Sequence, residues 1–244
     1  MTLNPGAYLE VLTADSEAFA ALAAANLHLQ VRACPDWTIA DLVSHLGGVY
    51  SWATAAVEGG GNRPDKERAR PPTDESELMP WFAEWRRRVI EALSARRPEE
   101  VAWSFAGDAT IGWWQRRQAL ETAVHLYDVQ SAGGAPATIG PELAADGIDE
   151  FLYVLLPNHL RRNQALDLSG TLHLHATDAP GEWQVDFTGP DVVVRREHGK
   201  ADTAVRGPAA DLYLWLWNRV DPSYGGLEVF GDTEVLEEWR RVRP

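Results

Sequence analysis

The sequence contains a single cysteine, Cys34, among its 244 residues. One cysteine excludes an internal disulfide and a zinc site built on several cysteines, so a bound metal ion would need histidine and carboxylate ligands. It also suits a reducing compartment. Basic residues are few as well, because 22 Lys and Arg stand against 36 Asp and Glu, a formal net charge of −14. This balance gives no electrostatic attraction to nucleic-acid phosphates or to an anionic bilayer, so neither is expected as a partner.

Long hydrophobic runs are also missing. The apolar stretch over residues 19–29 is short, is interrupted by Asn26 and His28, and follows acidic rather than basic residues. It therefore predicts neither a membrane span nor a secretory signal, and we expect a cytoplasmic protein. With 45% hydrophobic and 24% charged residues, the composition is that of a folded globular chain with one large or two modest domains.

The first two thirds of the sequence show helical periodicity. Four long helices are predicted, which start at the Asn4 cap, after the Thr38 cap, near Glu75 and near Thr110. Long helices joined by short connections are typical of a bundle. A fifth helix is expected from Pro141 to near Pro157.

Beyond residue 160 the hydrophobic period changes from that of a helix to that of a strand. Strands are predicted over residues 171–176, 183–188 and 192–196, followed by a helix over 208–220, a strand over 227–230 and a helix capped by Asp232. This order favours an antiparallel sheet with two helices. We therefore predict an α+β protein with a helical-bundle domain at residues 1–160 and a smaller α+β domain at residues 161–244.

Glu121 and His125 are four residues apart, so both side chains lie on one face of the predicted fourth helix. His45 lies on the apolar face of the predicted second helix, and bundles build metal sites from facing helices. Two histidines and one carboxylate leave an open position, as in catalytic zinc sites, and nickel, iron or cobalt would also fit. The alternatives are a surface pair at Glu121 and His125 and a His45 bonded to a backbone carbonyl. Asp128 is interpreted as a hydrogen-bond acceptor behind His125.

A second group of histidines lies in the predicted sheet. His173 and His175 share one face of a strand and can present two imidazoles to a metal ion, with Asp178 and His198 as possible further ligands. Alternating exposed residues on a two-faced sheet explain the same pattern, and we favour that explanation. Arginines such as Arg117 can attract an anion, although most surface arginines are simply solvated.

Three segments resemble the mycothiol-dependent maleylpyruvate isomerase family, and the resemblance extends over nearly the whole chain. They are CPDWTIADLVSH at residues 34–45, RQALETAVHLYD at residues 117–128, and the C-terminal GPAAD and WLWNR at residues 207–211 and 215–219. The resemblance implies a DinB-like four-helix bundle that binds a divalent metal, usually zinc. A smaller α+β domain related to sterol carrier proteins is expected to follow.

The resemblance also implies roles for individual residues. His45, Glu121 and His125 would be the metal ligands, and Arg219 would assist the substrate, with Arg206 as its rival. Asn218 stands where the family more often has glycine. A metal-bound thiol, expected to be mycothiol, would be deprotonated and would add to a cis double bond, and elimination after bond rotation would give the trans product.

Two classes of function therefore follow from the sequence. The first is a metal-dependent isomerase or thiol transferase that acts on a small electrophilic or carboxylate substrate. The second is a non-catalytic protein of the DinB-like kind that binds a small molecule or a lipid. No heptad pattern signals self-association, so a monomer or weak homodimer is expected.

Overall fold

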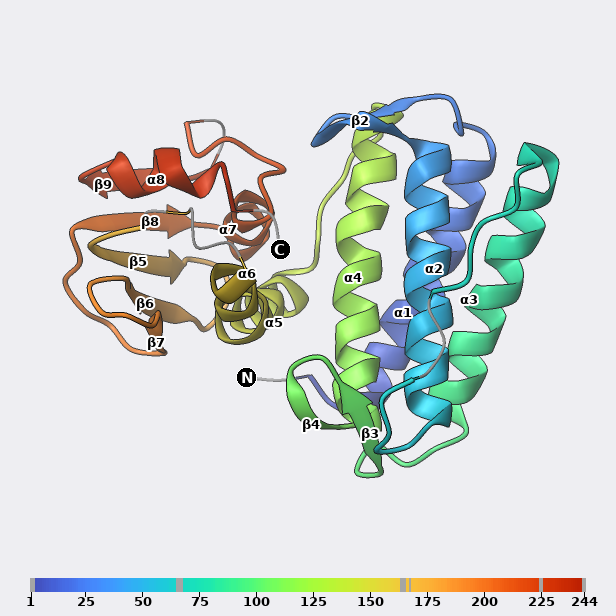
Figure 1. Ribbon diagram of the computed structural model, residues 1–244. Coiled ribbons are helices and arrows are strands. Elements are labelled where there is room, and N and C mark those ends of the chain that lie inside the picture. Colours follow the sequence, from blue (N-terminus) through green and yellow to red (C-terminus); the bar gives the residue numbers. More distant parts are fainter. Residues whose placement is uncertain (1–2, 65–67, 163–165, 167, 224–225, 243–244) are drawn as a thin grey trace. The chain divides into compact units, whose positions relative to one another are not determined.

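The computed structural model describes residues 3–64, 68–162, 166, 168–223 and 226–242. The spatial contacts between residues divide the chain into two compact units, Leu3–Thr138 and Ile139–Pro244 (Figure 1). The first is mainly helical and the second combines a five-stranded sheet with helices. The predicted α+β class is therefore confirmed.

The helical unit is built on four long helices that lie side by side (Figure 1). They are α1 (Pro5–Ala24), α2 (Ile39–Glu58), α3 (Leu78–Ser94) and α4 (Ile111–Ala132). Phe82 of α3 lies between Phe19 of α1 and Tyr50 of α2, with ring centroids 5.3 and 5.7 Å away. All three rings are fully buried, so the bundle core supplies the apolar contact that holds the helices together.

Short elements that the sequence analysis did not predict connect the helices. The hairpin of β1 (Gln30–Val31) and β2 (Cys34–Thr38) joins α1 to α2, and the hairpin of β3 (Val101–Ser104) and β4 (Gly107–Thr110) joins α3 to α4. A 3₁₀ turn, η1 (Glu75–Glu77), precedes α3.

Local capping explains where the two site-bearing helices begin. The Thr38 side chain accepts a hydrogen bond from the Asp41 backbone, and the Asp41 carboxylate accepts from the Thr38 backbone at 2.8 Å, which forms a capping box at the start of α2. At the start of α4, the Thr110 side chain accepts a hydrogen bond from the Trp113 backbone N–H at 3.3 Å. Both predicted starts are confirmed.

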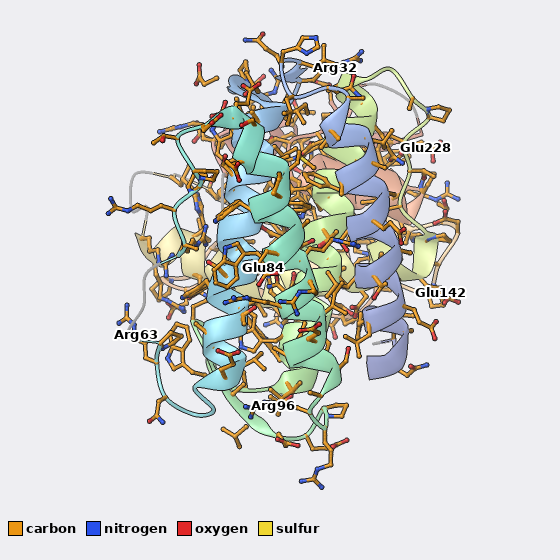
Figure 2. All side chains as sticks on the ribbon, turned by 90° about the vertical axis from the view of Figure 1, so that its right-hand side faces the viewer. Arg32, Arg63, Glu84, Arg96, Glu142 and Glu228 are labelled. Carbon is orange, nitrogen blue, oxygen red and sulfur yellow. The ribbon has the colours of Figure 1, made fainter. Side chains whose placement is uncertain are left out.

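The outward face of α3 is charged. Glu84, visible in Figure 2, forms salt bridges with Arg87 at 2.9 Å and with Arg88 at 2.7 Å. All three side chains are exposed, so these pairs keep the face solvated and contribute little to stability. Among the described helices, none has the length and the apolar composition needed to cross a bilayer.

The second unit begins with a continuous but irregular helical segment. It consists of α5 (Pro141–Glu150), the π-helical turn η2 (Phe151–Leu155) and α6 (Leu156–Arg162). The predicted end near Pro157 is wrong, because the helix continues past this residue. Pro157 lacks a backbone N–H and its ring crowds the preceding turn. The turn widens, so that the Leu156 N–H donates to the Phe151 carbonyl, and the helix accommodates the proline.

The sheet has the strand order β7-β6-β5-β8-β9. Its strands are β5 (Thr171–Ala176), β6 (Glu182–Asp186), β7 (Val193–Arg195), β8 (Thr203–Gly207) and β9 (Glu228–Gly231). The predicted antiparallel meander corresponds to β5, β6 and β7. The sequence analysis missed β8, which pairs with β5 in parallel and with β9 in antiparallel orientation. Two helices, α7 (Ala209–Leu216) and α8 (Glu234–Trp239), complete the unit.

The contacts of α5 place it in the same unit as the sheet. Gly147 packs so closely on Tyr213 of α7 that a Cβ atom there would lie 2.4 Å from the tyrosine ring. The Trp183 indole N–H of β6 donates to the Asp149 carboxylate of α5 at 2.6 Å. The division at Thr138 and Ile139 therefore lies about twenty residues before the boundary expected near residue 160.

Asp15 of α1 gives the helical unit a pH-dependent stability, because burial raises the pKa of its carboxyl group from 3.8 to about 6. The folded state thus binds this proton more tightly than the unfolded chain. Between about pH 4 and pH 6 the Asp15 carboxyl ionises in the unfolded chain but stays protonated in the folded chain. The free energy of unfolding therefore falls as the pH rises through this range. We expect Asp15→Asn to raise the melting temperature above pH 6 and to change it little at pH 4 or below.

Thermal unfolding of both proteins at several pH values measures this difference. Glu17→Gln, an exposed carboxylate on the same helix, is the matched control. A gain from Asp15→Asn that is equal at all pH values would contradict a role for Asp15 ionisation.

Candidate metal centre

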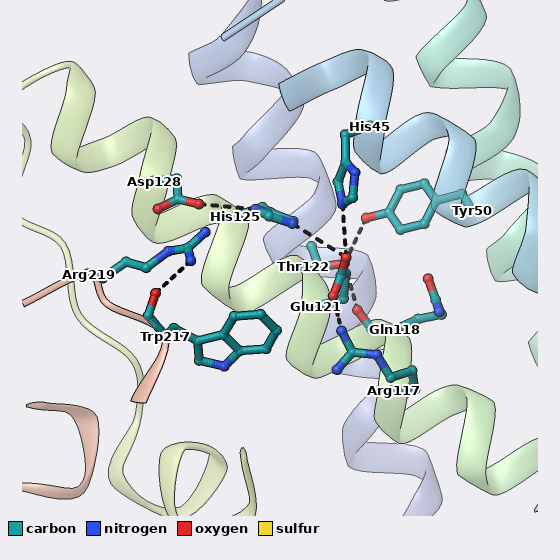
Figure 3. Close-up of polar contacts among 10 residues, drawn as sticks. All are labelled: His45, Tyr50, Arg117, Gln118, Glu121, Thr122, His125, Asp128, Trp217 and Arg219. Atoms are coloured by element: carbon teal, nitrogen blue, oxygen red, sulfur yellow. Dashed lines mark hydrogen bonds and ion pairs between the residues drawn. The ribbon is translucent and has the colours of Figure 1, made fainter. Parts of the chain in front are cut away.

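His45, Glu121 and His125 converge on one point of the helical unit (Figure 3). His45 lies on the second turn of α2, and the other two residues lie one turn apart on α4. Glu121 Oε1 is 3.2 Å from His45 Nε2 and 3.4 Å from His125 Nε2. The two imidazole rings meet edge to face with centroids 5.1 Å apart. The structure thus brings together the three residues that the sequence analysis selected as ligands.

The three side chains differ in burial. Glu121 and His125 are 10% and 9% exposed, whereas His45 is 26% exposed. The His45 ring also contacts Trp37 of β2, with ring centroids 5.2 Å apart. His45 is therefore the member of the set that solvent reaches most easily.

Arg117 lies one turn before Glu121 on α4 and is itself buried, with 7% of its side chain exposed. Its guanidinium donates a hydrogen bond to Glu121 Oε2 in a buried ion pair. This pair compensates the negative charge of Glu121 and engages one carboxylate oxygen, so that the other oxygen faces the imidazoles. For Arg117, the expectation of a solvated surface position is therefore wrong. The spacing of four residues from Glu121 was the signal for this pair.

His125 is oriented from behind by Asp128. Its Nδ1 atom lies 3.1 Å from Asp128 Oδ2, and Asp128 is 2% exposed. An Nδ1–H that donates to this carboxylate leaves Nε2 with its lone pair directed at Glu121 and His45. This contact agrees with the interpretation of Asp128 as an acceptor.

A buried hydrogen-bond chain fixes α2 against α4 beside Glu121. Thr122 donates its hydroxyl to the Gln118 carbonyl at 2.7 Å, so Tyr50 of α2 donates to Thr122 Oγ1, also at 2.7 Å. Burial raises the pKa of Tyr50, which keeps its hydroxyl protonated as a donor. The sequence analysis missed this chain, because Tyr50 and Thr122 are 72 positions apart and carry no recognisable motif.

The donor set fits a divalent transition-metal ion. Tetrahedral zinc with bonds of about 2.0 to 2.1 Å separates its ligand atoms by roughly 3.3 Å, and the distances here are 3.2 and 3.4 Å. Two imidazole nitrogens and one carboxylate oxygen suit zinc, and also nickel, iron or cobalt. Three protein ligands leave room for a fourth from solution. A ligand role for these residues stays a prediction.

The two arginines considered for the substrate both belong to the second unit. Arg219 follows α7, where its guanidinium donates to the Trp217 carbonyl at 2.8 Å and lies 5.6 Å from the centroid of the Trp217 ring. Arg206 on β8 is exposed and forms a salt bridge with Glu228 at 2.9 Å. Asn218 has a left-handed backbone with φ of 57°. This conformation suits glycine and is tolerated by asparagine, which explains the residue type found there.

Asp128→Asn tests the orientation of His125. The amide keeps the shape of the carboxylate but weakens the hydrogen bond that fixes the Nδ1–H tautomer, so we expect metal affinity at this site to fall by about 10- to 100-fold. Metal titration by calorimetry measures the change. Asp41→Asn, which weakens the cap of α2 without a contact to a predicted ligand, should lower the melting temperature and leave the affinity unchanged. An Asp128→Asn protein with unaltered affinity would show that His125 needs no such partner.

Comparisons with known proteins agree with this architecture. The chain matches the family model of the mycothiol maleylpyruvate isomerase N-terminal domain over residues 9–130, and that of the MDMPI C-terminal domain over residues 142–238. A crystal structure of the mycothiol-dependent maleylpyruvate isomerase has a TM-score of 0.63 at 13% identity, and that of a histidine-to-alanine mutant has 0.64 at 12%.

Both structural likenesses cover 94% of this chain and 95% of the other, and at these identities they concern the fold. A search of curated proteins gave no match. The two family models follow one another in the same order as the two compact units. The chain therefore belongs to the mycothiol maleylpyruvate isomerase family.

Proposed function

We propose that the protein is a metal-dependent enzyme that uses a low-molecular-weight thiol, mycothiol, to isomerise a small electrophile of the maleylpyruvate type or to transfer sulfur to it. The observation that supports this proposal is the convergence of His45 Nε2, His125 Nε2 and Glu121 Oε1 in a chain of this family. Zinc is the favoured ion because the donor set and spacing match its tetrahedral preference. When bound, such an ion supplies a lowered pKa for a thiol that coordinates it.

The protein residues around the proposed ligands have separate tasks. Arg117 holds Glu121 Oε2, which leaves Oε1 for the ion, and Asp128 holds the His125 ring by its Nδ1 atom. His45 is the most exposed of the three, so the thiol would approach from its side. Because these residues stand on packed helices, the site is preorganised and needs little rearrangement when it binds its reactants.

We assign Arg219 to the substrate. A guanidinium can neutralise the carboxylate of an acidic substrate and the negative charge that develops on its carbonyl oxygen. Arg206, which forms an exposed salt bridge with Glu228, is the alternative. A free thiol persists in a reducing compartment, so the proposed reaction also places the enzyme in the cytoplasm.

Removal of a proposed ligand tests the first part of this function. We expect His45→Ala and His125→Ala each to lose one equivalent of metal relative to wild type. Thiol-dependent turnover of maleylpyruvate should fall by at least about 100-fold, since loss of a partner that only orients a ligand already costs about 10- to 100-fold. Elemental mass spectrometry and an isomerase assay with added mycothiol give the two readouts.

The control is His28→Ala, an exposed histidine of the same unit, which should change neither readout. If the wild-type protein is fully occupied by metal but shows no turnover when the thiol is added, the enzyme assignment is wrong. The non-catalytic binding protein then becomes the better description.

Arg219→Ala tests the substrate role separately. We expect kcat/KM to fall by about 10²- to 10³-fold, the effect of removing one donor to a developing negative charge. Metal content should stay at the wild-type level, because Arg219 is not one of the three proposed ligands. Arg206→Ala, on the same unit, should change kcat/KM little. The opposite ranking of the two variants would transfer the role to Arg206.

A further inference from the structure

A second cluster of metal-binding side chains lies on the outer face of the sheet, within the second unit alone. It contains His173 of β5, Glu182 of β6 and His198 from the segment between β7 and β8. In the antiparallel register, β5 residues 171, 173 and 175 face the same side as their partners on β6, residues 186, 184 and 182. The opposite face carries Leu172, Leu174 and Trp183, which are fully buried. The cluster is thus separate from the apolar core.

The connection from β7 to β8 brings His198 to this face. In the strand order, β7 and β8 are separated by β6 and β5, so the chain must cross these two strands. The crossing segment bonds to both. The Gln184 side chain of β6 donates to the Lys200 carbonyl at 2.9 Å, and the Asp202 backbone donates to Thr171 Oγ1 of β5 at 2.9 Å. The crossing segment therefore lies over the sheet, with His198 on the same side as His173.

The three donor groups meet at one carboxylate oxygen. Glu182 Oε2 is 3.0 Å from His173 Nε2 and 2.6 Å from His198 Nδ1, and one atom from each of the three residues lies within 4.8 Å of the others. The two rings meet edge to face with centroids 5.4 Å apart. His175 Nδ1 is also 3.6 Å from the same oxygen. The nitrogens of His173 and His198 are therefore the two that lie within hydrogen-bond distance of this oxygen, and that of His175 is farther away.

The three residues of the cluster differ in how far they are exposed to solvent. His173 is 6% exposed, whereas the side chains of Glu182 and His198 are 29% and 79% exposed. An ion can therefore reach the cluster from solution past His198, while His173 and Glu182 are held by the paired strands. This arrangement offers two fixed ligands and one that the crossing segment supplies.

We propose that His173, Glu182 and His198 form a second divalent-cation site, which takes zinc or a similar transition-metal ion and ties the crossing segment to the sheet. Two imidazole nitrogens and one carboxylate oxygen are the same donor set as in the bundle. The ion would join three chain segments at residues 173, 182 and 198. Binding to the folded state alone would then stabilise the second unit. The sequence analysis favoured exposed sheet residues here, because it had no evident third ligand.

The experiment uses the chain of 244 residues with His45→Ala and His125→Ala, so that binding at the bundle cannot mask the second site. We expect calorimetric titration with zinc to show one remaining equivalent. Addition of His198→Ala should weaken this binding by at least about 100-fold, on the same reasoning as for any lost ligand. Because His198 is largely exposed, its removal should leave the fold intact, and circular dichroism checks this.

Two further measurements distinguish the proposal from non-specific binding. Glu182→Gln, which keeps the side-chain shape, should also weaken zinc binding, whereas His159→Ala on α6 should not. Zinc should shift the ring NMR signals of His173 and His198 and leave that of His159 in place. The proposal is overturned if the protein without the bundle ligands binds no zinc, or binds it equally well without His198. Either result leaves the proposed function at the bundle site intact.

Discussion

The negative charge of Glu121 inside the helical bundle is the constraint on which the candidate metal centre depends. A buried carboxylate is costly to remove from water unless positive charge and hydrogen bonds replace its hydration. Arg117 provides that charge at Oε2, and the imidazoles of His45 and His125 face Oε1. The carboxylate thus joins α2 to α4 through one oxygen and is held by its own helix through the other. Loss of Arg117 would leave both a buried charge and a carboxylate that is no longer held in one orientation.

The remaining contacts of the site serve to hold this carboxylate in place. The Tyr50 and Thr122 hydrogen bond ties the two helices one residue beyond Glu121, and Asp128 sets the ring of His125. Capping at Thr38 and Thr110 fixes where each helix begins and therefore which side chains face inward. The three donors stand on α2 and α4, so the packing of these two helices brings them together.

The two candidate sites show how one donor set behaves in two settings. At the bundle, Arg117 accompanies Glu121, and Glu121 and His125 are almost enclosed. On the sheet, Glu182 is partly exposed and its neighbours are imidazoles. Among these, burial of His173 lowers the pKa of that histidine, an effect that the charge of Glu182 partly offsets. The buried bundle site suits chemistry, because charges interact strongly in a low-dielectric surrounding. The more exposed sheet site suits a structural role, in which an ion holds the crossing segment on the sheet.

The sequence by itself determined the features that depend on neighbouring residues. Local hydrogen bonding predicts that helices start at Thr38 and Thr110. Periodicity predicts that Glu121 and His125 share one helix face and that strands replace helices after residue 160. Only the tertiary structure decided that His45 meets Glu121 across 76 positions, and that β8 pairs in parallel with β5. It also decided that α5 packs with the sheet and that the Glu182 carboxylate lies within hydrogen-bond distance of both His173 and His198. These contacts form when segments that are distant in the sequence pack against one another. A periodic pattern shows that one face of a helix or strand is apolar, but it does not show which other segment will pack on that face.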